Sequence, residues 1–176
     1  NAYAAIANGG KLYKPQIIDE IKTPEGVVIS RATIEERARL GISEETMNQV
    51  RAALIGVTHE DGGTARFLKA SNLKIAGKTG TAQVSRLIKR TKNVSSITYK
   101  FRDHAWFAGF APYDDPKIAV VVIVEHGGFG ASAAAPVARE IFKAYLGVPE
   151  GEDPAVALGK IEAKAKAGND EILTTE

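Results

Sequence analysis

The residues best suited to chemistry in this 176-residue chain stand together in residues 73–84, a stretch that reads as a β-strand. Lys78 supplies a cation, and Thr79 and Thr81 supply hydroxyl groups. Gly80 has no side chain, so an extended ligand can lie close to the backbone at that point. A strand edge that presents a cation, hydroxyls and bare backbone suits an extended, anionic ligand.

Two other motifs overlap this stretch, and neither fits its context. Gly77-Lys78-Thr79 resembles the end of a P-loop, but such a loop needs a glycine where Asn72 stands and a helix after the lysine, which Gly80 disfavours. The Ser-x-x-Lys spacing of Ser71 and Lys74 suits a nucleophile and its base only on a helix, where positions three apart share a face. On a strand the two side chains point to opposite faces, so we interpret the match as coincidental.

The glycine-rich segment 127–130 indicates two further sites that the rest of the chain does not complete. A dinucleotide fingerprint in this position needs a second parallel strand after the helix, and the sequence indicates none. Ser132 lies in a sequence close to a nucleophile elbow, but enzymes of that type place their histidine after the serine, and none follows His126. We interpret the segment as a β-to-α connection and Ser132 as a helix N-cap or a turn residue.

The histidines do not indicate a metal site. His59, His104 and His126 have no spacing that places them on one helix face, and the chain has no cysteine. We expect neither a metal nor a cofactor. We interpret each of the histidines as a surface or loop histidine, and His104, beside Asp103 at the start of a predicted strand, is the one to inspect for a structural hydrogen bond.

The composition is that of an ordinary soluble globular domain with one core. Hydrophobic residues make up 44% of the chain and charged residues 25%, with a formal net charge of +2. So small a net charge favours neither nucleic-acid binding nor membrane-surface binding. The longest apolar run, Ile118 to Val124, is too short to span a bilayer.

Caps, turns and apolar periodicity predict the elements around the candidate strand. The first residues indicate the end of a helix stopped by Asn8-Gly9-Gly10, and we expect an N-terminal portion to be missing from the chain. Ser43 is expected to cap a helix that Gly62-Gly63 ends. The strand over 117–125 is almost entirely apolar or β-branched, so we expect it to be buried on both faces. The other expected elements are a hairpin of 16–22 and 27–29, a basic loop over 85–103, a strand over 105–111, a helix over 133–146 and a frayed or disordered tail.

Four segments resemble, in order, the C-terminal part of the transpeptidase domain of class B penicillin-binding proteins. One of them carries Lys-Thr-Gly, a signature of serine enzymes that penicillin acylates. Residues 102–105 and 110–113, with the glycine-rich turn after His126, look most like the elongation type, the penicillin-binding protein 2 group. The four segments are 1–10, 77–83, 105–112 and 134–138.

The resemblance implies an α+β fold, a penicillin-binding and serine β-lactamase-like domain with an antiparallel sheet flanked by helices. The sheet would have five strands, with the Lys-Thr-Gly strand at its edge. Residues 1–148 would be the C-terminal portion of the transpeptidase domain and 149–176 a flexible or partly helical tail. The implied activity is that of a peptidoglycan D,D-transpeptidase, which cross-links the cell wall by acyl transfer from D-Ala-D-Ala stem peptides and is the covalent target of β-lactams.

The resemblance also implies roles for individual residues. Lys78 would hydrogen-bond the serine of a Ser-x-Asn motif, and the backbone N–H of Thr81 would form half of the oxyanion hole. Thr79 and Thr81 would bind the carboxylate of the donor peptide or antibiotic, while Gly80 would admit the ligand as an added strand. Neither the nucleophilic serine on a helix nor Ser-x-Asn is present, so we expect this chain alone to be inactive.

Partners and location follow from the same resemblance. The implied partners are stem peptides, β-lactams, the upstream half of the domain, a membrane glycosyltransferase and other elongation-complex proteins, with no nucleic acid. The implied location is the periplasmic face of the bacterial inner membrane. Two alternatives stay open, namely a non-catalytic penicillin-sensing receptor domain and a serine β-lactamase or D,D-carboxypeptidase.

Overall fold

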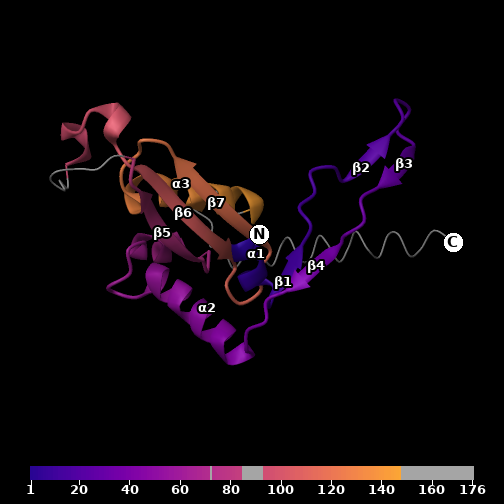
Figure 1. The fold of residues 1–176 in the computed structure, drawn as a ribbon, viewed down its shortest axis with the longest axis horizontal. Coiled ribbons are helices and arrows are strands. Elements are labelled where there is room, and N and C mark those ends of the chain that lie inside the picture. Colours follow the sequence, from indigo (N-terminus) through magenta and orange to yellow (C-terminus); the bar gives the residue numbers. More distant parts are fainter. Residues whose placement is uncertain (72, 85–92, 148–176) are drawn as a thin grey trace.

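The computed structural model describes residues 1–71, 73–84 and 93–147, which form the expected α+β fold (Figure 1). The predictions for Asn72, for 85–92 and for the tail lie outside these residues. The helices are α1 (Ala2–Ala7), α2 (Glu44–His59) and α3 (Gly130–Tyr145), with short 3₁₀ helices η1 (Arg66–Ser71), η2 (Val94–Ser96) and η3 (Tyr99–Phe101). The strands are β1 (Lys11–Tyr13), β2 (Glu20–Lys22), β3 (Val28–Arg31), β4 (Glu36–Arg39), β5 (Ala76–Ala82), β6 (His104–Ala111) and β7 (Ile118–Val124).

The body of the molecule is built on a three-stranded antiparallel sheet in the order β5-β6-β7. Gly80 of β5 stands opposite Trp106 of β6, and Phe107 of β6 stands opposite Val122 of β7. The Lys-Thr-Gly strand is therefore an edge strand among the described residues, as predicted. The described part of the chain contributes three strands to this sheet, against the five that the resemblance implies.

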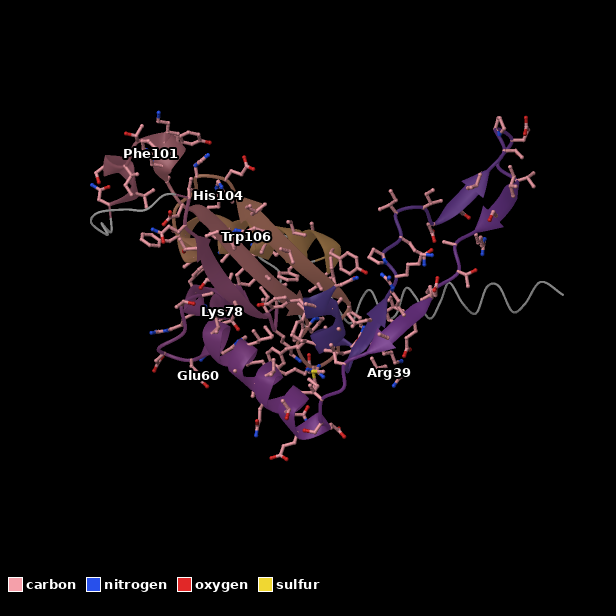
Figure 2. The ribbon with its side chains drawn as sticks, viewed as in Figure 1. Arg39, Glu60, Lys78, Phe101, His104 and Trp106 are labelled. Atoms are coloured by element: carbon pink, nitrogen blue, oxygen red, sulfur yellow. The ribbon has the colours of Figure 1, made fainter. Side chains whose placement is uncertain are left out.

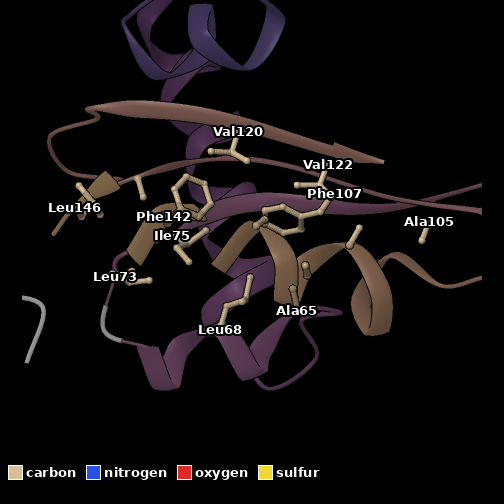
Figure 3. Packing of buried hydrophobic residues seen from close by; sticks show 14 residues of the cluster. Ala65, Leu68, Leu73, Ile75, Ala105, Phe107, Val120, Val122, Phe142 and Leu146 are labelled. Atoms are coloured by element: carbon tan, nitrogen blue, oxygen red, sulfur yellow. The ribbon is translucent and has the colours of Figure 1, made fainter. Parts of the chain in front are cut away.

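The core lies between one face of this sheet and the helices α3 and η1 (Figure 3). Phe107 from β6 and Phe142 from α3 are fully buried. A Cβ on Gly77 would lie 2.6 Å from the end of the Phe107 ring, so the glycine makes room for the ring against β5. The cluster comprises Ala65, Leu68, Leu73, Ile75, Ala105, Phe107, Ala111, Val120, Val122, Ala134, Ala135, Ala138, Phe142 and Leu146.

The opposite face of the sheet is covered at one end, where α1 and α2 pack on the fully buried Ala76 and Phe110, and is open at the other end in the described residues. Val121 is 57% exposed and Ile123 is 46% exposed, next to Trp106 at 37%. The prediction that β7 is buried on both faces is therefore wrong for this part of the chain, because β7 is an outer strand whose alternate side chains face away from the core. A run of β-branched residues favours an extended backbone but does not show what covers it.

In the described residues, no helix is long and apolar enough to cross a membrane.

Helix α2 begins at its predicted cap and ends earlier than predicted. The Ser43 hydroxyl accepts a hydrogen bond of 3.1 Å from the Thr46 amide. The helix ends at His59 instead of running to Gly62-Gly63, because the backbone is already extended at Glu60. The buried Thr58 hydroxyl donates to the Ile75 carbonyl at 2.5 Å, which ties the end of α2 to the start of β5.

Strands β1 to β4 form a narrow arm that leaves the body (Figure 1). Strands β2 and β3 pair around the predicted turn, where the Thr23 amide donates to the Val27 carbonyl and Gly26 adopts a φ of +91°. The predicted hairpin is thus confirmed. Arg39, on this arm, lies well apart from Lys78 on β5 (Figure 2).

Candidate active-site strand

Lys78 presents an unneutralised cation on the outer edge of the sheet. Its side chain is exposed, and its Nζ donates to the Thr79 carbonyl at 2.8 Å. Among the described residues it forms no ion pair and no hydrogen bond to a serine. The charge is therefore available to an anionic ligand or to a group from outside these residues.

Thr79 and Thr81 lie on the same face of β5, as residues two apart in a strand must. Thr81 is exposed, whereas Thr79 is half-buried, with its hydroxyl oxygen 2.7 Å from that of Thr64. Thr64 lies in the turn between α2 and η1 and was not among the predicted site residues. Its only sequence signal is that it follows Gly62-Gly63, a pattern that indicates a helix end rather than a site.

Gly80 is closely packed: the backbone of Gly130 lies against its own backbone, and the Trp106 side chain lies where a side chain of Gly80 would project. A Cβ on Gly80 would lie 3.2 Å from the Trp106 Cβ on the open face. A Cβ on Gly130 would lie 2.2 Å from the Trp106 carbonyl oxygen and 2.5 Å from that of Gly80. The first residue of α3 therefore packs directly against the backbone of the candidate strand, and only glycine fits there.

The glycine-rich segment before α3 is a β-to-α connection, as predicted, but the helix starts earlier than expected. It begins at Gly130, with Phe129 as its N-cap, instead of near Ala133. Ser132 is therefore not the N-cap: it lies in the first turn and donates to the Phe129 carbonyl at 3.2 Å. The sequence did not reveal this start because the segment has no capping side chain.

A group of hydrogen bonds joins the end of β5, the start of β6 and the turn after β7. The His126 amide donates to His104 Nδ1 at 2.9 Å, so the histidine singled out for inspection does accept a structural hydrogen bond. Asp103 accepts from the Val84 amide at 3.1 Å through its carboxylate, and its carbonyl accepts from the Gly128 amide. These hydrogen bonds fix the residues that follow β5 to the start of β6 and to the turn after β7.

Lys74 belongs to a structural ion pair and not to the candidate strand. Its Nζ lies 2.5 Å from the Asp114 carboxylate in the β6–β7 connection. The hydrogen bond from Lys74 lowers the pKa of Asp114, and the same bond raises the pKa of Lys74. The strand predicted over 73–84 is thus shorter than expected, because β5 begins only at Ala76, and Lys74 lies between the end of η1 at Ser71 and that strand. In the part of the chain that the structure describes, no group of three His, Cys, Asp or Glu side chains could hold a metal ion.

Comparison of the sequence with known proteins finds related transpeptidases. The profile of the penicillin binding protein transpeptidase domain matches residues 1–143. The peptidoglycan D,D-transpeptidase MrdA of Haemophilus influenzae is 43% identical over 98 residues, covering 54% of this chain and 15% of that protein. MrdA of Salmonella typhimurium is 32% identical over 142 residues, covering 80% of this chain and 23% of that protein.

Solved structures share the fold. Penicillin-binding protein A of Mycobacterium tuberculosis superimposes with a TM-score of 0.61 at 28% identity, covering 82% of this chain and 30% of that chain. PBP2 of Pseudomonas aeruginosa gives a TM-score of 0.60 at 30% identity, covering 85% of this chain and 29% of that chain. The chain spans no more than 30% of the length of any of these four proteins. It belongs to the penicillin-binding protein transpeptidase family, as an elongation-type class B member.

Proposed function

We propose that the polypeptide to which this chain belongs is a peptidoglycan D,D-transpeptidase, and that residues 1–148 form the C-terminal portion of its catalytic domain. The observation that carries the proposal is the edge strand β5 in a chain similar to proteins named for that activity. Its Lys78 forms no ion pair among the described residues, and its threonines present hydroxyls. The nucleophilic serine and the Ser-x-Asn motif would come from residues that precede Asn1. This chain alone would hold substrate without reacting with it.

In the proposed reaction, the donor stem peptide pairs with β5 as an added strand, over Gly80. A serine oxygen attacks the penultimate D-Ala carbonyl and forms an ester, while the bond to the terminal D-Ala breaks and that residue leaves with a proton on its nitrogen. The amine of a neighbouring stem then attacks the ester, forms the cross-linking amide and releases the serine.

The residues of β5 have distinct roles in this scheme. Lys78 places positive charge in the cleft, and the hydroxyls of Thr79 and Thr81 donate to the substrate carboxylate. The backbone N–H of Thr81 donates to the oxyanion that develops on the attacked carbonyl. Loss of one such donor typically costs about 3 kcal/mol of transition-state stabilisation.

The proposed ligands, partners and location extend from the relatives. Penicillin-binding protein A of M. tuberculosis has been solved as a penicillin G acyl-enzyme complex, and PBP2 of Helicobacter pylori has been solved in complex with MreC. We therefore propose that the complete polypeptide is acylated by β-lactams and works with cell-wall elongation proteins, including a membrane glycosyltransferase. The location consistent with this role is the periplasmic face of the inner membrane, with an anchor outside this chain.

Labelling with a fluorescent penicillin, combined with a cross-linking assay, tests the proposal. The complete polypeptide should form a stable covalent adduct and join two stem peptides with release of D-Ala, whereas this chain alone should do neither. Stable labelling without cross-linking would point to a penicillin-sensing receptor. Rapid loss of the label would indicate a β-lactamase, release of D-Ala without cross-linking would indicate a carboxypeptidase, and absence of any label would overturn the proposal.

A further inference from the structure

Resting on the proposed function, we propose that Thr64 is a positioning residue for the ligand carboxylate, acting through the hydroxyl of Thr79. The two hydroxyl oxygens lie 2.7 Å apart, which is the usual length of a hydroxyl–hydroxyl hydrogen bond. The residues come from different elements, since Thr64 lies in the turn before η1 and Thr79 lies on β5. The bond therefore joins that turn directly to the candidate strand.

The backbone around Thr64 is fixed on both sides. Gly63 packs so tightly against α2 that an added Cβ would lie 2.3 Å from the Val57 carbonyl oxygen. That same carbonyl accepts a 3.0 Å hydrogen bond from the amide of Ala65, which is fully buried. Thr64 is thus held between two anchored neighbours, while its own side chain remains exposed beside Thr79.

The hydrogen-bonding capacity of a hydroxyl shows what this arrangement does. Each hydroxyl has one hydrogen to donate and two lone pairs to accept with, whereas an ionised carboxylate only accepts. When a carboxylate binds Thr79, the Thr79 hydrogen must point at the ligand. Thr64 can then donate its own hydrogen to the Thr79 oxygen, so both hydroxyls donate in one direction.

This directed pair has two effects on binding. It holds the Thr79 side chain in one rotamer instead of several, which lowers the entropy that binding must fix. It also polarises the Thr79 hydroxyl towards the anion, because hydrogen bonds in a chain strengthen one another. Thr64 thus acts on carboxylate-bearing ligands and not on the attacked carbonyl.

The test uses the complete polypeptide and two probes, penicillin G and its carboxylate methyl ester. Thr64→Val removes the hydroxyl and keeps the side-chain shape. It should lower the second-order rate constant of acylation by penicillin G about three- to tenfold, the range expected for one hydrogen bond, and leave the ester rate nearly unchanged. Thr64→Ser should restore the wild-type rate.

Two further variants separate positioning from a general structural effect. In a Thr79→Val background, Thr64→Val should cause no additional loss, because the residue through which it acts is gone. Thr98→Val is the matched control, since it removes an exposed hydroxyl that makes no capping hydrogen bond and should change neither rate.

Three outcomes would count against the proposal. Equal slowing for both probes, additive losses in the double variant, or a wild-type penicillin G rate in Thr64→Val would each overturn the role of Thr64 while leaving the proposed function intact. A wild-type polypeptide that neither probe acylates would overturn the proposed function, and this inference with it.

Discussion

Gly80 is the position at which one added side chain should block the substrate edge of β5. A Cβ there would already stand 3.2 Å from the Trp106 Cβ, which is tight, and the two further methyl groups of valine would extend into the space above the strand. We predict that Gly80→Val in the complete polypeptide abolishes labelling by fluorescent penicillin, and that Gly80→Ala only slows it. Labelling of Gly80→Val at the wild-type rate would show that the ligand does not bind over Gly80.

Gly41→Val provides the matched control for that prediction. No atom outside its neighbours lies within 4 Å of a Cβ built at Gly41, and its φ is not in the left-handed region. The same chemical change in open space should therefore leave labelling unaltered. A comparable loss in both variants would show that added bulk, rather than the position on β5, is responsible.

At the residue scale, the sequence could predict side chains with a chemical signature but not those that act through a neighbour. Lys78 and its threonines were identifiable because a cation, hydroxyls and a glycine share one strand. Thr64 was not, since its pairing with Thr79 depends on a turn that brings together residues 15 positions apart. No local pattern encodes that approach.

At the element scale, Gly130 determines how closely α3 packs against β5 and β6. A Cβ at this residue would lie 2.2 Å from the Trp106 carbonyl oxygen and 2.5 Å from that of Gly80, distances that only a backbone shift can relieve. We predict that Gly130→Ala destabilises the fold by about 1–3 kcal/mol, the usual range for overpacking, and slows acylation by penicillin.

Thermal unfolding and labelling of the same preparations check that prediction, with Gly62→Ala as the control. A Cβ at Gly62 meets nothing within 4 Å, so this variant should retain both stability and rate. If Gly130→Ala were as stable and as reactive as the wild type, the contact between α3 and the strand would be looser than its geometry indicates.

The ion pair between Lys74 and Asp114 should make the connection between β6 and β7 sensitive to acid. Because the hydrogen bond from Lys74 lowers the pKa of folded Asp114, the pair contributes stability above the ordinary carboxyl pKa of 3.8. That contribution is lost as the pH falls through the lower folded pKa of Asp114. The raised pKa of Lys74 has the opposite sense, so its contribution is lost only as the pH rises through the alkaline range.

The test compares thermal unfolding of wild type and Lys74→Met across pH. The variant should have a lower Tm than wild type at neutral pH, and the difference should shrink to nothing in acid. The difference should be modest, because both side chains are about half exposed. Lys69→Met, which removes an exposed lysine with no ion pair among the described residues, should show no such pH-dependent difference. A Tm difference that persists in acid would show that Lys74→Met lowers stability through lost packing and not through the lost charge.

Among the elements, those with a local chemical signal were predictable and those that depend on distant packing were not. The capping side chain of Ser43 predicts the start of α2, and Pro24 with Gly26 predicts the hairpin turn. The early end of α2 and the early start of α3 depend instead on tertiary fit, through Thr58 bonded to Ile75 and through Gly130. Neither contact leaves a pattern in the neighbouring sequence.

At the scale of the whole molecule, one face of the sheet is covered by the main core, and the other is covered only at the end where α1 and α2 pack on Phe110. The open part of that second face carries Trp106, Val121 and Ile123, while the outer edge of β7 has no partner strand among the described residues. The β-branched sequence of β7 predicted a strand buried on both faces, yet burial depends on whatever else lies against it. A strand with these properties would aggregate if it stayed uncovered, because its free edge can template pairing with other chains.

If the proposed upstream portion covers this face and pairs with β7, hydrogen exchange should detect it. In this chain alone, the amides of β7 that point away from β6 have no strand partner in the part of the chain that the structure describes, and they should exchange quickly. In the complete polypeptide the same amides should become protected. The amides of β6 serve as an internal control, since β6 has a neighbour on both sides in either form. Equal exchange of β7 in the two forms would mean that its outer edge remains free, and that the rest of the domain joins this chain through another surface.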